Sequence, residues 1–279
     1  MRNITKQQEQ EIIRLYVQEH RGQVYCSKTV LGINNPNRVK DILKKYHIPI
    51  RNFREAAIES NINRAKKKND DYFSIQSPNM AWLLGFLAAD GTISKRDNTI
   101  KLGLSEKDSE ILERIKTELS LEDTEVKHYT NSRGYDCCSL EWTSRKQKND
   151  LSKYSVVPEK TFILKPPYLL NSQYYIDYIR GYFDGDGSIN YCHIKGGALR
   201  WQVCSATREI IQFVIDTLYN EYGIKKVNIY SQQRKTAPLY YCQYSTNATK
   251  KIYPVLYGTG STLYLKRKRD HYEEILKMK

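Results

Sequence analysis

The sequence lacks several features that define common classes of protein. Its longest run free of charge and strong polarity, residues 81–89, is nine residues long, whereas crossing a bilayer takes roughly 20. No apolar segment follows the first basic residue at the N-terminus, so we expect no secretory signal. We therefore expect no contact with a membrane, and a location in the cytoplasm of a bacterium or phage host, or in an organelle.

The spacing of the cysteines matches no common metal or disulfide pattern. The six cysteines contain no CxxC pair and are not spaced with the five histidines as in a zinc site. They are Cys26, Cys137, Cys138, Cys192, Cys204 and Cys242. Because we expect a reducing compartment, we predict neither disulfides nor structural zinc.

Positive charge, in contrast, is in excess. The 279 residues include 45 Lys and Arg against 31 Asp and Glu, a formal net charge of +14. Residues 1–72 and 171–279 each carry +7, whereas residues 73–170 are neutral overall. Nucleic acid is the commonest partner of such a protein, because Lys and Arg placed on phosphates release counterions. The alternative is a basic surface that is merely solvated.

The chain contains an internal repeat of about 100 residues. Residues 82–93 (WLLGFLAADGTI) align with residues 178–189 (YIRGYFDGDGSI) at an offset of 96, and both share glycine, an aromatic residue, Asp-Gly and Ile. Repeated units of this size usually form two similar lobes related by a pseudo-twofold axis. We expect a first lobe over residues 73–170 and a second lobe over residues 171–279.

Each unit alternates predicted helices with strand pairs. An apolar helix, at 78–90 and again at 172–186, runs into Asp-Gly, where Gly91 and Gly187 can take the left-handed conformation that ends a helix. After a hairpin, Ser105 and Asp108 form a capping-box pattern that opens the next helix of the first unit. A second strand pair follows, at 126–130 with 138–142 and at 227–231 with 239–244. This order predicts the α+β class, with helices packed on antiparallel sheets.

Polar side chains alternate along one predicted strand of each unit. A period of two places them on one sheet face, where they can reach base edges and phosphates, and a β-ribbon fits the major groove. The alternative is an ordinary solvent-facing sheet. The predicted DNA contacts are Lys127, Tyr129, Asn131 and Arg133 in the first unit and Asn228, Tyr230, Gln232 and Arg234 in the second.

Asp90 and Asp186 are the residues that point most directly to chemistry. Gly85 and Gly181 remove a side chain where the two apolar helices would cross, so the two carboxylates would meet at the helix C-termini. Those ends carry partial negative charge, and a divalent cation would relieve the repulsion. Carboxylate and carbonyl oxygens suit Mg²⁺, which supports phosphodiester hydrolysis. The alternative is that each Asp-Gly is only a turn that ends a helix.

The two Asp-Gly helices resemble a known family motif. Residues 83–91 (LLGFLAADG) and 179–187 (IRGYFDGDG) resemble the two copies of the LAGLIDADG motif of single-chain homing endonucleases, and the resemblance covers about residues 73–279. It implies two pseudo-symmetric lobes whose saddle-shaped sheets lie over a long DNA target. It also implies Mg²⁺ held by Asp90 and Asp186, with the carbonyls of Ala89 and Gly185 as additional ligands.

The same resemblance assigns roles to several polar residues. Residues 157–161 (VPEKT) and 263–268 (LYLKRK) look like the family's basic segments near the active site. Lys160 and Lys266 are therefore candidates for stabilising the pentavalent phosphate or positioning water, and Lys268, also a candidate DNA contact, is the substitute for Lys266. Gln202 resembles a polar residue that organises water in some members. The alternative for the lysines is plain phosphate binding or a solvated charge run. We interpret Asp184, which aligns with Ala88, as structural.

Residues 1–57 predict a small helical domain. Residues 5–18 have the pattern of a capped helix, residues 24–31 that of a short helix ended by Gly32, and an Asn-Asn-Pro sequence at 34–36 opens a third. This outline resembles the helix-turn-helix heads of recombinases and phage regulators, in which Asn37, Arg38 and Lys40 would face the DNA groove. A plain three-helix cap is the alternative. Residues 58–72 are predicted to be a basic linker.

Together these features predict a monomeric, Mg²⁺-dependent, site-specific DNA endonuclease of intron mobility that hydrolyses both strands of a long target. The alternatives are a non-cleaving regulator that binds DNA with the same lobes, or an RNA maturase with intron RNA as a further partner. The two acids distinguish these hypotheses, because a protein that only binds nucleic acid does not need Asp90 and Asp186.

Overall fold

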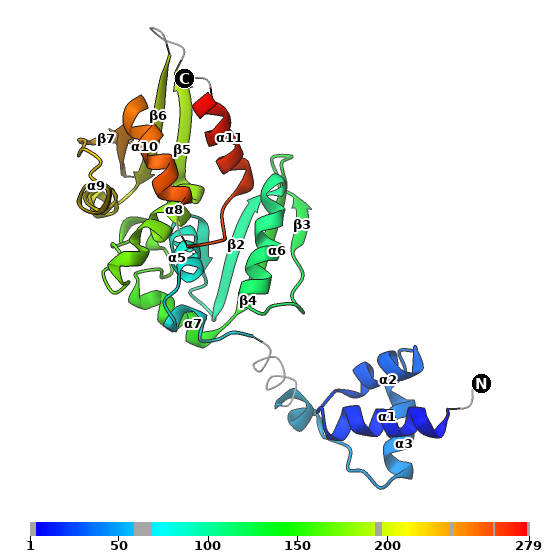
Figure 1. Cartoon of the computed structure of the whole chain (residues 1–279). Helices are drawn as coiled ribbons and strands as arrows, with labels where there is room; N and C mark the ends of the chain where they lie inside the picture. Colours follow the sequence, from blue (N-terminus) through cyan, green and yellow to red (C-terminus); the bar gives the residue numbers. More distant parts are fainter. Residues whose placement is uncertain (1–3, 59–67, 193–196, 235–236, 259, 278–279) are drawn as a thin grey trace. The chain divides into compact units, whose positions relative to one another are not determined.

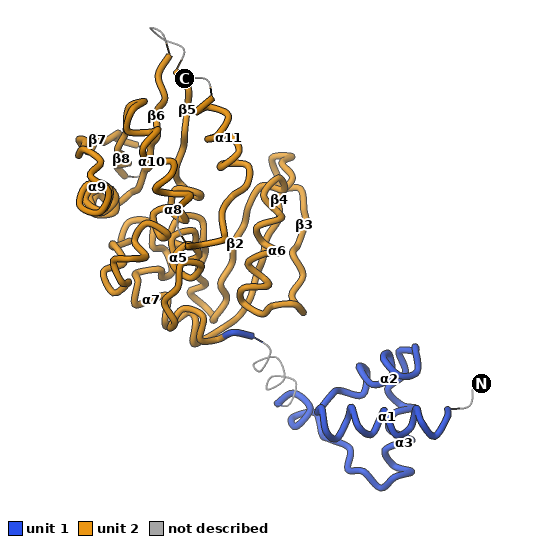
Figure 2. Tube along the Cα trace, in the orientation of Figure 1, with its two compact units in different colours: residues 1–69 blue, residues 70–279 orange. Residues whose placement is uncertain are grey.

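The computed structural model describes residues 4–58, 68–192, 197–234, 237–258 and 260–277. The chain divides into two compact units, Met1–Asn69 and Asp70–Lys279 (Figure 2). The expected class, two α+β lobes preceded by an all-α segment, is confirmed (Figure 1). Within the described ranges, every helix is too short or too polar to cross a membrane.

In the described part of the first unit, three helices surround a small apolar core, and residues 53–58 are also helical. The three helices are α1 (Lys6–Val17), α2 (Gln23–Leu31) and α3 (Pro36–Lys45). Thr5 and Gln8 form a reciprocal capping box at α1, Gly32 ends α2 with a left-handed φ of 67°, and the Asn35 side chain caps α3. The core contains Ile12, Leu15, Tyr16, Cys26, Val39, Ile42 and Leu43. The three predicted helices are therefore present, while their helix-turn-helix role stays a prediction.

The predicted linker, residues 58–72, is only partly described. Residues 59–67 lie outside the described residues. The end of the segment belongs to the second unit, because the Ser144 hydroxyl donates to the Asp70 carboxylate and Tyr72 is buried in that unit's core. The linker sequence thus ends before Asp70, and the lobe begins earlier than the predicted residue 73.

The second unit holds both lobes and follows the repeat. The first lobe comprises α5 (Pro78–Asp90), β1 (Gly91–Ile93), β2 (Thr99–Ser105), α6 (Ser109–Glu118), β3 (Lys127–Thr130), β4 (Asp136–Thr143) and α7 (Arg145–Lys153). The second comprises α8 (Tyr175–Asp186), β5 (Gly187–Cys192), β6 (Ala198–Ser205), α9 (Arg208–Tyr222), β7 (Ile229–Gln233), β8 (Pro238–Tyr244) and α10 (Thr246–Tyr257). Helix α11 (Lys266–Lys277) follows as an addition to the repeat, and the short 3-10 turns are η1 (Tyr72–Ser74), η2 (Glu106–Asp108), η3 (Lys160–Phe162) and η4 (Ser172–Tyr174).

Each lobe contains a four-stranded antiparallel sheet with the same topology. The strand orders are β1-β2-β4-β3 and β5-β6-β8-β7. The first strand of each sheet starts directly after the apolar helix, so Gly91 lies opposite Leu102 and Gly187 lies opposite Val203. Each sheet therefore places the last residue of its helix, an aspartate, at the helix–strand junction.

Helices α5 and α8 cross in direct backbone contact at the centre of this unit (Figure 1). A Cβ built on Gly85 would overlap the Tyr178 carbonyl and lie 2.9 Å from the Tyr182 amide nitrogen. A Cβ on Gly181 would overlap the Trp82 carbonyl and lie 2.9 Å from the Phe86 amide nitrogen. All these partners are related by the repeat offset of 96, so the crossing has the pseudo-twofold symmetry that the sequence predicted.

Two local predictions were wrong. Gly91 and Gly187 have φ angles of −70° and −91°, so neither is left-handed. Both positions instead lack room for a side chain. An added Cβ would lie 2.5 Å from the Leu87 carbonyl oxygen at Gly91 and 2.6 Å from the Phe183 carbonyl oxygen at Gly187. The expected capping box also fails, because the Ser105 side chain makes no capping bond and Asp108 pairs with Arg267.

Candidate active site

The crossing of α5 and α8 brings Asp90 and Asp186 together. These residues are the last of the two helices. A Cβ built on Gly185 would lie 3.0 Å from Asp90 Oδ2 and would overlap the Ala89 methyl group, so the two helix ends touch. Both carboxylates reach the surface. The structure thus joins the two acids that the sequence singled out.

The two carboxylates resist ionisation in the absence of a cation. Burial against surrounding protein atoms and, next, the charge of Asp186 raise the pKa of Asp90 to about 6. Burial also raises the pKa of Asp186, although a hydrogen bond from Tyr182 opposes this shift. A cation bound at this point would favour the ionised form of both carboxylates and so lower their pKa values. Among the described residues, no group of three or more His, Cys, Asp or Glu side chains is arranged to hold a metal ion. A pair of carboxylates is the kind of ligand set that Mg²⁺ accepts, because this ion keeps several water ligands.

Two lysines extend the site, one at the end of each motif helix. The Lys160 ammonium donates to the Gly91 carbonyl. The Lys268 ammonium donates to the carbonyls of Phe183, Asp184 and Gly187, each at 2.7 Å, and to that of Gly185 at 3.3 Å. Gly91 and Gly187 are repeat equivalents, so Lys160 and Lys268 occupy related positions.

The charges of these lysines are balanced by the acids. Burial lowers the pKa of Lys160, and the charges of Asp186 and Asp90 oppose the shift. Burial likewise lowers the pKa of Lys268, opposed by Asp184, Asp90 and Asp186. Each ammonium therefore lies within electrostatic reach of both motif acids.

Lys266, the other predicted catalytic lysine, lies elsewhere. Its side chain is 64% exposed, and its ammonium pairs with Asp270 at 2.5 Å within α11. Helix α11 begins at Lys266, so residues 266 and 268 point to nearly opposite sides of its first turn. The structure therefore brings Lys268, rather than Lys266, next to the motif acids, and the catalytic roles of both lysines stay predictions.

The other predicted site residues of the second lobe are placed less centrally. Gln202 lies on β6 opposite Ser188 and Gln243, one position from the helix–strand junction. Its side chain is half-buried. The Gly185 carbonyl, a predicted metal ligand, accepts a hydrogen bond from Lys268. The roles of Gln202 and of the Ala89 and Gly185 carbonyls stay predictions.

The predicted DNA-contacting rows lie partly on strands and partly beside them. Lys127 and Tyr129 are exposed on the edge strand β3, and Tyr230 and Gln232 are exposed on β7. Asn228 precedes β7 and Arg234 follows it, and both are exposed. These residues remain available for contact with a partner.

Asn131 and Arg133 lie beyond β3, in the turn before β4. The Asn131 side chain accepts hydrogen bonds from the backbone amides of Arg133 at 2.9 Å and Tyr135 at 3.1 Å. Asn131 therefore shapes this turn, whereas the Arg133 side chain is exposed. In the first unit, Asn37 and Lys40 are exposed on α3 and Arg38 is half-buried.

Two site features were not predicted from the sequence. Asp108 is buried, and its charge contributes to the raised pKa of Asp90. Its carboxylate accepts two hydrogen bonds from Arg267, at 3.0 and 2.9 Å. The second feature is Lys101, which faces Thr92 as Gln202 faces Ser188. Only the sheet register reveals that equivalence.

Part of the first lobe matches a known family model. Residues 77–148 match the family model of the LAGLIDADG-like domain. This match confirms the resemblance that residues 83–91 carry. The second lobe lies outside the matched segment, and its likeness to the first rests on the repeat and on the shared sheet topology. A comparison with curated proteins finds no significant match.

Several solved structures are similar to this chain. The meganuclease I-SmaMI bound to uncleavable DNA has 14% sequence identity and a TM-score of 0.49, with 73% of this chain and 88% of that chain covered. Full-length DUF199/WhiA from Thermatoga maritima has 15% identity and a TM-score of 0.43, with 75% and 64% covered. A glycine-to-serine variant of I-DmoI in complex with its target DNA in the presence of 2 mM Mg has 15% identity and a TM-score of 0.43, with 67% and 97% covered.

Proposed function

We propose that this protein is a site-specific DNA endonuclease that cleaves both strands of a long target with Mg²⁺ and acts as a monomer. The observation that carries the proposal is the meeting of Asp90 and Asp186, with Lys160 and Lys268 beside them. A protein that only binds DNA gains nothing from two carboxylates held together at its centre, because they repel the phosphate backbone as well as each other. Their retention therefore favours catalysis.

The acids and the lysines of the site would have different roles in hydrolysis. Asp90 and Asp186 would hold the divalent cation, and a bound Mg²⁺ would supply an activated water and stabilise the leaving 3′ oxygen. Lys160 and Lys268 are fixed next to the acids, so their positive charges can offset the extra negative charge on the pentavalent phosphate. The exposed polar rows on β3 and β7 would bind the flanking DNA.

The test is cleavage of a randomised DNA library by the purified full-length chain, followed by sequencing of the new ends. With Mg²⁺ we expect ends that share one sequence and a fixed stagger between strands, and with Ca²⁺ we expect binding without cleavage. Enrichment of one bound sequence without cleavage in Mg²⁺ or Mn²⁺ would contradict the proposal and favour a DNA-binding regulator. Enrichment of RNA alone would favour a maturase.

The raised pKa of Asp90 predicts an effect of pH on stability. Its folded pKa of about 6 exceeds the ordinary value of 3.8, so the folded state binds the proton more tightly than the unfolded state. Stability of the metal-free protein should therefore fall as pH rises from about 4 to about 6 and then level off. Asp184, whose pKa burial also raises to about 6, contributes in the same direction.

Mg²⁺ separates the contribution of Asp90 from that of Asp184. The cation favours ionised carboxylates, so it should raise the melting temperature by about 2–4 °C at pH 8 and have little effect at pH 5. Scanning calorimetry at both pH values measures this shift, and Asp90→Asn should remove it. Equal shifts at the two pH values would show that the cation binds elsewhere.

The first unit is proposed to bind DNA through the start of α3. If Lys40 contacts a phosphate, Lys40→Gln should reduce the slope of log K against log salt concentration by about 0.9. Lys6→Gln, an exposed lysine at the start of α1, is the matched control and should leave the slope unchanged. Fluorescence anisotropy with the selected target at several salt concentrations gives both slopes. Equal slopes for wild type and Lys40→Gln would exclude this contact.

A further inference from the structure

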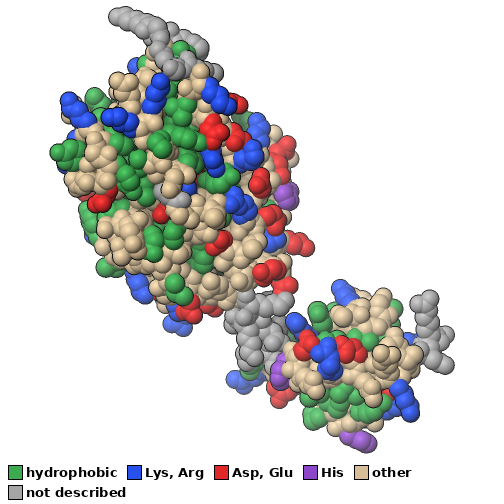
Figure 3. All heavy atoms as spheres, in the orientation of Figure 1, with side chains coloured by type: hydrophobic (Ala, Val, Ile, Leu, Met, Phe, Trp, Pro, Cys, Tyr) green, Lys and Arg blue, Asp and Glu red, His purple; other side chains and the backbone are tan. Residues whose placement is uncertain are grey.

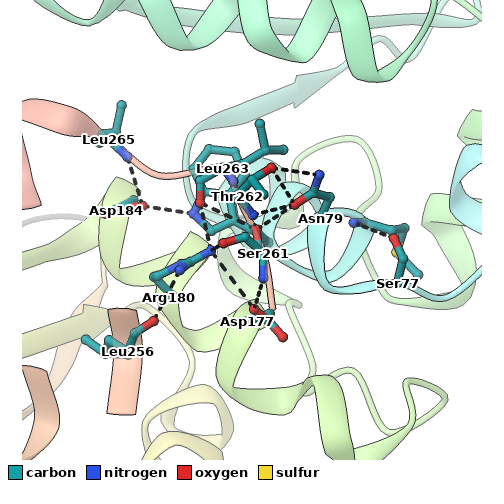
Figure 4. Close-up of polar contacts among 12 residues, drawn as sticks. Ser77, Asn79, Asp177, Arg180, Asp184, Leu256, Ser261, Thr262, Leu263 and Leu265 are labelled. Atoms are coloured by element: carbon teal, nitrogen blue, oxygen red, sulfur yellow. Dashed lines mark hydrogen bonds and ion pairs between the residues drawn. The ribbon is translucent and has the colours of Figure 1, made fainter. Parts of the chain in front are cut away.

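The segment between α10 and α11 crosses from one lobe to the other. We call residues 261–265 the strap. On the first lobe, the Asn79 side-chain oxygen accepts hydrogen bonds from the Thr262 amide at 2.8 Å and from the Ser261 hydroxyl at 3.0 Å (Figure 4). The Arg114 guanidinium donates to the Thr262 carbonyl. The start of the strap therefore contacts the first lobe, although its sequence belongs to the second.

The second lobe holds the strap with buried charges. Arg180 is 1% exposed, and its guanidinium donates to the carbonyls of Ser261 at 2.9 Å and Leu263 at 2.8 Å (Figure 4). Asp177, on the same helix, accepts a hydrogen bond from the Ser261 amide at 3.3 Å. A buried charge without partners is strongly unfavourable, so these bonds fix the path of the strap.

Asp184 joins the end of the strap to both motif helices. It lies on α8 and is 1% exposed. One of its oxygens accepts hydrogen bonds from the Trp82 indole on α5 at 2.9 Å and from the Leu265 amide at 3.2 Å. The strap thus cannot shift at Leu265 without breaking a bond to a buried carboxylate.

The three residues after the strap lead to the active site. Arg267 forms its paired hydrogen bonds with Asp108 of the first lobe, and Lys268 then reaches the carbonyls at the end of α8. Figure 3 shows that basic and acidic side chains are mixed on the face that carries α11, as expected for a surface of internal ion pairs. This end of α11 is therefore fixed from both lobes.

We propose that Asp184 and the Asp108–Arg267 pair are positioning residues for Lys268. They hold the strap and the first turn of α11, so that the Lys268 ammonium stays against the end of α8 and beside the motif acids. A catalytic role for Lys268 rests on the proposed function, whereas the position of its ammonium group does not. A catalytic group must be held within a fraction of an ångström of its working position to be effective. The contacts of Asp184 and of the Asp108–Arg267 pair would hold Lys268 in this way.

The first lobe provides an internal comparison. Lys160, the repeat-related lysine, comes from η3, and Ala88 stands where the second copy has Asp184. Alanine has no carboxylate to hold a backbone amide. The position of Lys160 should therefore be independent of the strap, and the two lysines should respond differently when the strap is released.

The experiment measures the reactivity of individual lysines in the full-length protein without DNA or metal. The protein is treated briefly with the N-hydroxysuccinimide ester of acetic acid, and peptide mass spectrometry gives the acetylation rate at each lysine. Lys268 and Lys160 should react at least about tenfold more slowly than the exposed Lys266, because both amines donate to backbone carbonyls, and Lys160 is buried while Lys268 is half-buried. The variants are Asp184→Ala and Arg267→Gln, with Asp184→Asn and Arg267→Lys as conservative replacements.

We expect the acetylation rate of Lys268 to rise about tenfold in Asp184→Ala and in Arg267→Gln, since each variant loses a charge-assisted hydrogen bond. Lys160 and Lys266 should be unchanged, and the conservative variants should restore part of the protection. An unchanged rate at Lys268 in Arg267→Gln, whose replaced side chain is half exposed and should fold, would overturn the proposal. An equal rise at Lys160 would also overturn it, because it would indicate general loosening.

Cleavage is measured separately in the same variants. A lower single-turnover rate with unchanged target affinity would add that Lys268 acts in the reaction. Higher reactivity of Lys268 with unchanged cleavage would retain the positioning role and contradict the catalytic role of Lys268. The two proposals therefore fail on different measurements.

Discussion

Asp90→Asn and Asp186→Asn should each lower the single-turnover rate of DNA cleavage by at least about a thousandfold. Asparagine keeps the size of the side chain and removes the charge that would hold Mg²⁺. Target affinity in Ca²⁺ should change little or improve, because the variant has one fewer negative charge facing the phosphates. Rapid-quench kinetics with the selected target give the rate, and fluorescence anisotropy gives the affinity.

Asp270→Asn is the matched control for these variants. Asp270 is paired with the exposed Lys266 on α11, so its loss should leave cleavage within about twofold of wild type. Full cleavage by both Asp90→Asn and Asp186→Asn would rule out the acid pair as the catalytic centre. Loss of cleavage in Asp270→Asn would instead indicate that Lys266 takes part in the reaction.

Gly85→Ala should lower the free energy of unfolding by about 3 kcal/mol or more, because the new methyl group would overlap the Tyr178 carbonyl where α5 and α8 cross. Backbone atoms cannot move aside as a flexible side chain can. The helices would have to separate, which would also move the two acids apart. Urea unfolding followed by circular dichroism measures the change in stability.

Gly103→Ala is the comparison for that substitution. Gly103 is exposed on β2, and an added Cβ there meets no other atom within 4 Å. Its effect on the free energy of unfolding should stay within about 0.5 kcal/mol. Similar losses in both variants would mean that strand and helix propensities, rather than the close crossing, set the stability.

The repeat was the most informative feature of the sequence. Glycine and aspartate recur at one offset, and two copies of a helix that need close approach can achieve it against each other. That argument predicted both the crossing at Gly85 and Gly181 and the meeting of Asp90 with Asp186. The helices of the first unit were also predictable, because caps such as Thr5 and Asn35 act within a few residues.

Features that depend on long-range contacts were not predictable in this way. The sequence LYLKRK offers two lysines, and only the start of α11 at Lys266 decides that Lys268 faces the acids. Asp108 fits the spacing of a helix cap, yet it accepts hydrogen bonds from Arg267, which is 159 residues away. The sequence predicts that Gly91 is needed for a left-handed φ angle, whereas in the structure an added side chain at this position would collide with the Leu87 carbonyl. For Lys268 and Asp108 the deciding partners lie far away in the sequence, whereas for Gly91 the deciding contact is with Leu87, four residues earlier in α5.

The strap also limits how the two lobes can be recombined. A chimera that joined this second lobe to the first lobe of another protein would carry residues 261–268 with it, but would lose the strap's partners on the first lobe. Asn79 and Arg114 contact the strap, Asp108 contacts Arg267, and Trp82 contacts Asp184, which holds the end of the strap. All four lie outside the sheet surface that a designer would keep for DNA specificity. Exchange of lobes would therefore require these four positions to be transplanted as a set with the C-terminal segment.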